Sequence, residues 1–193
     1  YFLSHWREKA RGPLLVITPH LRNAETLIED VRFFAKGQDV PSFLFPEWET
    51  LPYDEIPPHP EIIRERVRVL FSLLNGEKVL IVSSIKALMQ KVQAPAELKA
   101  SVIYLSEGDE IDRDRLIHFL HDGGYSSART VEERGDFSVR GAIIDLYTPF
   151  YEGPLRLEFE GDRLESIRRF ELETQRSLTQ GTMKNAILLP ARD

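Results

Sequence analysis

The sequence predicts an α/β fold in two parts, a subdomain with a parallel sheet and an α+β domain with an antiparallel sheet. In the first half, short apolar runs alternate with segments of helical spacing, which is typical of βαβ units. After Ala94-Pro95 this alternation stops, and one helix is followed by several short strands bounded by turn residues. The change of pattern places a domain boundary near residue 100.

The first subdomain is expected to contain buried strands at 14–18, 42–45 and 79–83. The helical spacing after the first strand is carried by Leu21, Ala24, Leu27, Ile28, Val31 and Phe34. A second helix is predicted over 61–74, with Asn75-Gly76 as its C-terminal stop.

The second domain is predicted at about 101–179. It should begin with a strand at 101–105 and continue with a helix at 112–122, which ends at Gly123-Gly124. The inward residues of this helix are expected to be Leu116, Phe119 and Leu120. Several short antiparallel strands should then complete the domain.

Two arginines lie on the predicted antiparallel strands. In 155–160, which reads LRLEFE, every second residue is apolar, so Arg156 is expected to face away from the core. The same alternation in 137–140 turns Arg140 outward, and the following Gly141 is expected to mark a bulge or a close backbone approach. Such arginines either form surface ion pairs, for example with Glu158 or Glu160, or bind a partner.

Charge favours a protein partner over a nucleic acid. The chain has a net charge of −6, and residues 101–180 carry 10 basic and 17 acidic side chains. A phosphate-binding surface needs the opposite sign. The chain has no cysteine, no apolar run of the roughly 18 residues that a membrane span needs, and no signal-peptide pattern, so we expect a cytoplasmic protein without a membrane partner.

Motifs of enzymes and cofactor sites are missing from the sequence. There is no G-x-x-x-x-G-K-[ST] phosphate loop, since Gly76-Glu77-Lys78 lies between a helix and a strand, in the reverse context. His118 and His121 share a helix, but Asp114 and Asp122 are the only nearby further ligands, so surface histidines are expected rather than a metal site. We therefore expect no catalysis, no cofactor and no metal in this chain.

The proline-rich segment 45–60 and the helix after it leave alternatives open. Trp48 and Tyr53 could stack on nucleic-acid bases, but the accompanying charges are acidic, which favours aromatic side chains that fix a long connection onto the sheet. Arg64 and Arg68 lie one helical turn apart and either pair with neighbouring glutamates or contact a partner.

Most of the chain resembles a known family. The stretch 133–170 resembles the UvrA-binding domain shared by UvrB and the transcription-repair coupling factors. The resemblance to the coupling factors is carried by FPEWETLPYD at 45–54, PHP at 58–60, LFSLLNGEKV at 70–79, FELETQRSL at 170–178 and LLPAR at 188–192. UvrB carries a long aromatic-rich hairpin in its first subdomain that this sequence lacks. The chain also starts without methionine, and we expect it to be part of a longer protein.

The resemblance implies a domain arrangement. Residues 1–100 would form a degenerate helicase-like subdomain 1a, lacking its first strand and phosphate loop. Residues 101–179 would be an inserted UvrA-binding domain 2. Residues 180–193 would return to the first sheet as the start of subdomain 1b, because the apolar run 187–190 has no evident partner in domain 2.

The resemblance also implies a function. The positions of Arg140 and Arg156 match the arginines that the family presents to UvrA, while Glu160 stands where the coupling factors often have an aromatic residue. The chain would recruit nucleotide excision repair to stalled RNA polymerase. Polymerase, double-stranded DNA, ATP and Mg²⁺ would be bound by other domains of the full-length protein. The alternatives are the N-terminal part of a UvrB-like ATP-dependent subunit and a nucleic-acid-binding module.

Overall fold

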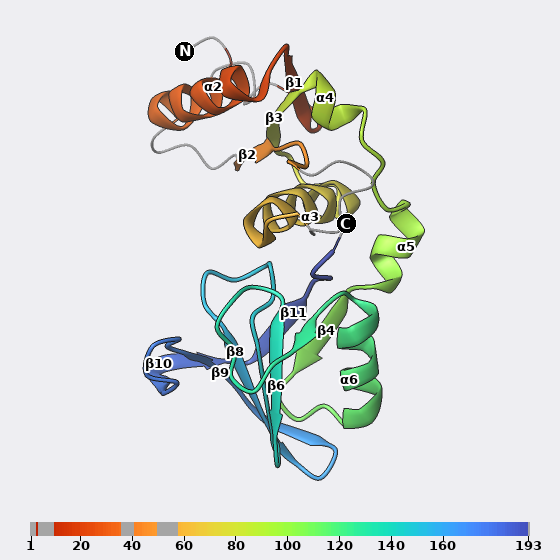
Figure 1. The fold of residues 1–193 in the computed structure, drawn as a ribbon, viewed down its shortest axis with the longest axis vertical. Coiled ribbons are helices and arrows are strands. Elements are labelled where there is room, and N and C mark those ends of the chain that lie inside the picture. The colour runs from red at the N-terminus through yellow and green to blue at the C-terminus, as the bar shows by residue number, and fades with distance from the viewer. Residues whose placement is uncertain (1–2, 4–9, 36–40, 50–57, 193) are drawn as a thin grey trace. The chain divides into compact units, whose positions relative to one another are not determined.

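The computed structural model describes residue 3 and the ranges 10–35, 41–49 and 58–192 (Figure 1). The chain divides into two units, Tyr1–Pro95 and Ala96–Asp193, each with its own internal contacts. Within the described part of the chain, no helix has both the length and the apolar character that crossing a membrane requires.

The first unit is built around a parallel sheet of three strands in the order β1-β3-β2. Its elements are β1 (Leu14–Thr18), α2 (Leu21–Phe34), β2 (Ser42–Phe45), α3 (Pro60–Leu74), β3 (Leu80–Ser84) and α4 (Ile85–Leu88). The three predicted strands and the parallel arrangement are confirmed, with β3 beginning one residue later than expected.

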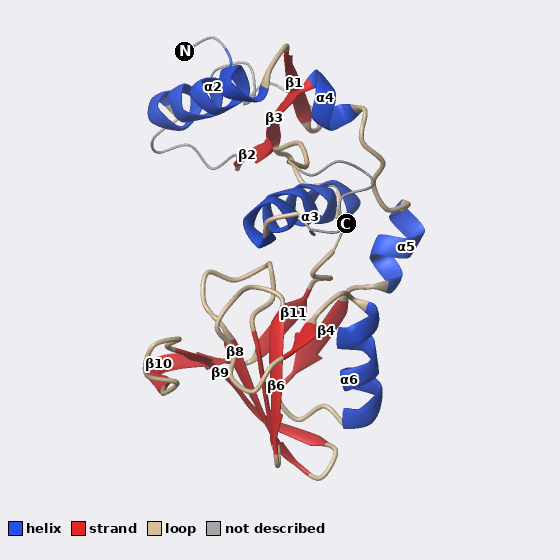
Figure 2. Ribbon diagram, in the orientation of Figure 1, coloured by secondary structure: helices blue, strands red, loops and turns tan. Residues whose placement is uncertain are grey.

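The two long helices of this unit cover opposite faces of the sheet (Figure 2). Because side chains alternate along β3, Leu80 and Val82 pack against α2, whereas Ile81 packs on the α3 side with Val69. The apolar runs predicted as strands are therefore apolar on both faces, as the interior of a parallel sheet requires.

The helix boundaries follow local signals. The α3 helix begins at Pro60, with the His59 side chain accepting a hydrogen bond from the Glu61 backbone N–H at 3.3 Å. It ends at Asn75, and Gly76 then takes a left-handed φ of 67°, which glycine adopts without strain.

The second unit contains a six-stranded sheet in the order β10-β9-β8-β7-β6-β5 (Figure 1). Its elements are α5 (Pro95–Ala100), β4 (Ile103–Ser106), α6 (Arg113–Asp122), β5 (Ser126–Ser127), β6 (Asp136–Arg140), β7 (Ile143–Leu146), β8 (Leu155–Glu160), β9 (Arg163–Phe170), β10 (Ser177–Met183) and β11 (Asn185–Leu188). All pairings are antiparallel except that of β5 with β6.

The α6 helix packs on one face of this sheet and forms the core of the unit. Leu116 and Leu120 are buried against Phe137, Ile144 and Leu157, as predicted, while Phe119 is only partly buried. The helix is capped by Asp112, whose carboxylate accepts a hydrogen bond from the Arg115 backbone N–H at 3.0 Å.

The predicted return of 180–193 to the first sheet is wrong. The apolar run forms β11, which pairs antiparallel with β4 inside the second unit. Ala186 and Leu188 are buried in the same core as Leu116 and Leu120. The run therefore does have a partner in this domain, and the second unit extends through residue 193.

Candidate functional site

The antiparallel sheet of the second unit has one face that packs against α6 and an opposite face that carries charged and polar side chains beside a small apolar cluster of Val131, Tyr147 and Phe170. Cross-strand pairing places Ser138, Asp145, Arg156 and Arg168 in one row, from β6 to β9. Alternate positions along the same strands, among them Phe137, Ile144, Leu157 and Ile167, belong to the core that α6 covers. We call the face that carries this row the outer face. Both arginines predicted from the sequence lie on it.

Arg156 is held by several contacts on this face. Its Nε and Nη2 donate to the two carboxylate oxygens of Asp145 at 2.7 and 2.9 Å. Further hydrogen bonds reach the backbone oxygen of Gln175 at 3.2 Å and Oγ of Ser177 at 3.3 Å. The guanidinium lies 4.9 Å from the centre of the Phe170 ring. The hydrogen-bonded Asp145 carboxylate raises the pKa of Arg156, so its charge is permanent.

Arg140 shares the same carboxylate but is far more accessible. Its Nη2 donates to Oδ2 of Asp145, and its side chain remains 47% exposed, against 12% for Arg156. Arg140 is the last residue of β6, before the turn formed by Gly141 and Ala142. Gly141 has a φ of 57°, so it serves a tight hairpin turn; a Cβ placed there would meet nothing within 4 Å. The expected bulge or close approach at Gly141 is therefore replaced by a turn.

Two expectations about the arginines are corrected. Alternation placed Arg156 on the polar side of its strand, but the side chain is mostly buried because Phe170, Gln175 and Ser177 contact it. The ion-pair partner of both arginines is Asp145, rather than Glu158 or Glu160. Glu158 instead accepts from Ser166 Oγ at 2.6 Å.

Asp145 is the residue of this site that sequence reasoning missed. Its side chain is 1% exposed, although it carries a charge in the middle of the apolar strand β7. A lone acid in such a strand is a detectable signal, because a buried carboxylate requires a cationic or hydrogen-bonding partner. The structure provides this partner, because the register of β7 and β8 places Asp145 opposite Arg156.

Glu160 lies at the exposed end of β8. It precedes the turn at Gly161, whose φ is 62°, and it is paired in register with Arg163 on β9. A register shift between Glu158 and Phe159 accompanies this end of the hairpin. Since the Phe159 backbone N–H donates to the carbonyl of Ala142, the β8–β9 turn and the turn beside Arg140 lie at the same end of the sheet.

Arg113 fixes this end of the sheet from the core side. It is the first residue of α6, and its Nη2 donates to the carbonyl oxygen of Gly141, in the turn that follows Arg140. Its guanidinium lies 5.5 Å from the centre of the Phe159 ring. The hairpin that carries Arg140 is thus tied to the helix.

Other residues named from the sequence have structural roles in the first unit. Arg64 pairs with Glu61 at 3.2 Å and with Glu65 at 3.0 Å, and Arg68 lies 5.6 Å from the ring centre of Phe43. These contacts favour the glutamate-pairing interpretation of Arg64.

Arg66 lies between Arg64 and Arg68 in the sequence and was not singled out by the sequence analysis, yet its side chain is fully buried. Arg66 is 0% exposed, donates to the carbonyl of Pro46 at 2.8 Å, and lies 5.0 Å from the ring centre of Trp48. Trp48 therefore contacts α3 through Arg66, whereas the prediction was that it fixes the connection onto the sheet. Tyr53 and the rest of 50–57 lie outside the described residues.

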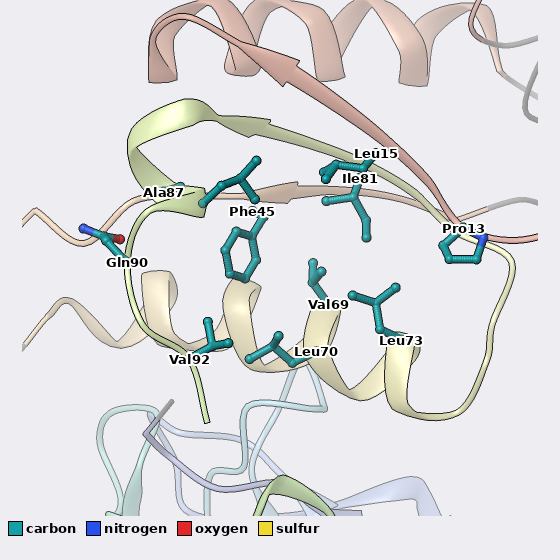
Figure 3. Close-up of a pocket in the computed structure, with 11 residues that line it drawn as sticks. Pro13, Leu15, Phe45, Val69, Leu70, Leu73, Ile81, Ala87, Gln90 and Val92 are labelled. Atoms are coloured by element: carbon teal, nitrogen blue, oxygen red, sulfur yellow. The ribbon is translucent and has the colours of Figure 1, made fainter. Parts of the chain in front are cut away.

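The first unit also contains an apolar pocket of about 290 Å³ (Figure 3). Its lining is mostly aliphatic, with the largest share from α3 (Val69, Leu70 and Leu73), and Gln90 is its polar member. The Gln90 amide oxygen accepts from the Trp48 backbone N–H at 2.8 Å and from Arg66 at 3.2 Å. Among the described residues, no titratable side chain lines this pocket, and no group of three or more His, Asp or Glu residues is arranged to hold a metal ion.

Comparison with known protein families gives a match for most of the second unit. Residues 103–193 match the family model of the UvrB interaction domain. This range of the chain includes every strand of the outer face. The second unit thus belongs to a class of protein-interaction domains.

The whole chain is similar to transcription-repair-coupling factors. It is 38% identical to that of Haemophilus influenzae over 191 residues, covering 99% of this chain and 16% of the relative. It is 39% identical to that of Myxococcus xanthus over 198 residues, and 33% identical to that of Escherichia coli over 186 residues, again covering 16% of each relative. Over nearly its whole length the chain is similar to one segment of the transcription-repair-coupling factors, and it spans about one-sixth of the length of these relatives.

Proposed function

We propose that this chain is a UvrA-binding module and that the outer face of its second unit is the docking surface. The observation that carries the proposal is the match of residues 103–193 to the UvrB interaction domain, because this range holds Arg140, Arg156 and Glu160. In the cytoplasm, the module would recruit UvrA, and with it nucleotide excision repair, to stalled RNA polymerase. RNA polymerase and double-stranded DNA are partners that we assign to segments outside this chain.

The geometry supports a docking role for the arginines. A surface guanidinium can engage a carboxylate with two parallel hydrogen bonds, and its truncation at the centre of an interface is often costly. Arg140 keeps about half of its side chain open to a partner while Asp145 holds one of its nitrogens. An arginine that is already ordered loses less conformational entropy on binding.

Calorimetric titration of purified UvrA with this chain tests the proposal. We expect saturable binding that weakens as salt is raised, because charged groups contribute to it. Absence of binding across the accessible concentration range would contradict the proposed function.

Glu160 is expected to tune the interaction. If UvrA offers an apolar contact to the aromatic residue that coupling factors often carry here, Glu160→Phe should hold or raise the affinity, by up to about tenfold. If Glu160 instead pairs with a basic residue of UvrA, the same substitution should lower the affinity. The residue is exposed at the end of β8, so either change should leave the melting temperature nearly unaltered. Titration of UvrA with wild type and variant decides between the two.

We further propose that the first unit is a degenerate helicase-like scaffold and that the chain is not an enzyme by itself. ATP and Mg²⁺ would be used by other segments of the full-length protein. The isolated chain should therefore show no ATP turnover above background, with or without DNA, and no saturable micromolar ATP binding by calorimetry. Support comes from the pocket in the first unit, whose lining among the described residues is apolar and contains no cationic side chain for a triphosphate. Micromolar ATP binding would overturn this part of the proposal.

A further inference from the structure

The outer face contains one buried acid that serves two arginines of very different exposure. Asp145 is 1% exposed, Arg156 is 12% exposed and Arg140 is 47% exposed. Arg156 engages both oxygens of the carboxylate, and Arg140 shares Oδ2 with it. The carboxylate therefore connects a buried cation to an accessible one.

We propose that Asp145 is the positioning residue of the docking surface, acting on UvrA binding through the arginines that it holds. This inference rests on the proposed function and adds a residue to it. Asp145 is too buried to offer its own oxygens to a partner. Its effect on binding must be transmitted by the side chains to which it is bonded.

Two physical effects give the carboxylate this role. A free arginine side chain samples many rotamers, and ordering it costs conformational free energy. Asp145 removes part of this cost for Arg140 before UvrA arrives. In addition, Arg140 and Arg156 both donate a nitrogen to the same oxygen, so their positive charges lie close together. Without the negative charge between them the two guanidinium groups would repel each other, and the accessible Arg140 would move away.

A purely structural ion pair would behave differently. Such a pair would need only Arg156, which already satisfies both oxygens of Asp145. Its loss would lower stability without changing the affinity of molecules that remain folded. The contact with Arg140 couples the buried pair to the accessible surface.

The test is the affinity of the full chain for UvrA after Asp145→Asn, measured well below the melting temperature of the variant. We expect the affinity to fall about 3- to 30-fold. Tyr125→Phe is the matched control for stability, because it removes a buried hydrogen bond, from the Tyr125 hydroxyl to the carbonyl of Leu189 at 2.6 Å, within the same unit. This control should lower the melting temperature but change affinity less than twofold.

A mutant cycle with Arg140→Ala separates positioning from stability. If Asp145 acts through Arg140, Asp145→Asn should lose most of its effect on affinity in the Arg140→Ala background. Equal fold-changes in both backgrounds would overturn the proposal that Asp145 positions Arg140. If Asp145→Asn does not fold, Asp145→Glu retains the charge but displaces the carboxylate, and it should weaken binding several-fold by the same mechanism.

The outcomes distinguish this inference from the proposed function. Weak binding of Arg140→Ala together with wild-type affinity of Asp145→Asn would remove only the positioning role. Wild-type affinity of Arg140→Ala would remove the docking surface itself.

Discussion

Replacing Arg156 by alanine should lower the free energy of unfolding of the second unit by about 2–4 kcal/mol. The substitution removes both of the hydrogen bonds that Arg156 donates to Asp145, leaving a carboxylate that is 1% exposed with Arg140 as its remaining cation. Removing one partner of a buried pair is costly, because the other charge stays buried. The contacts with Gln175 and Phe170 are lost as well.

This expectation replaces the one that the strand alternation alone supports. An outward arginine on a polar face should change stability by about 0.5 kcal/mol or less. Scanning calorimetry and denaturant titration decide between the two values. Both tryptophans, at positions 6 and 48, precede the second unit, so tryptophan fluorescence reports on the first unit and provides an internal control. An unchanged calorimetric transition in Arg156→Ala would contradict the structural role.

The companion variant is Arg156→Ala with Asp145→Asn. An uncharged amide costs less to bury without a cation than a carboxylate does, so the second substitution should restore part of the lost stability. A double variant that is less stable than either single variant would argue against the buried charge as the cause.

Arg140→Ala should have its main effect on binding. We expect the affinity for UvrA to fall about 5- to 150-fold, which corresponds to roughly 1–3 kcal/mol. Because Arg140 is about half exposed and Arg156 still holds Asp145, the stability of the variant should change by about 1 kcal/mol or less. Calorimetric titration with UvrA and a thermal melt of the same sample measure both quantities. Arg140 is thus a cleaner probe of the docking surface than Arg156.

The fold could largely be predicted where the local pattern determines the answer. Short apolar runs predicted the three parallel strands, and the stop signals Asn75-Gly76 and Gly123-Gly124 predicted the C-terminal ends of α3 and α6. The partner of the late apolar strand could not be predicted in this way. Periodicity shows that Ala186 and Leu188 need burial, but it does not say against which strand, and β4 lies about 80 residues earlier in the chain.

The candidate site shows the same limit at the level of side chains. Alternation correctly assigned Arg140 and Arg156 to the face opposite the core. It could not show that residues from the segment after β9 cover Arg156, since that contact depends on tertiary structure. The acid in the apolar strand β7 was present in the sequence, and the cost of burying a charge predicts that Asp145 needs a cation.

The central claim is that the outer face binds UvrA, and the most direct test is a side-by-side titration of UvrA with wild type, Arg140→Ala and Arg115→Ala. Arg115 is a matched control, because it is an exposed arginine on α6, the helix that covers the opposite face of the same sheet. We predict a loss of about 5- to 150-fold for Arg140→Ala and less than a twofold change for Arg115→Ala. Equal affinities of wild type and folded Arg140→Ala would contradict the claim and leave Arg140 as a surface ion-pair partner of Asp145.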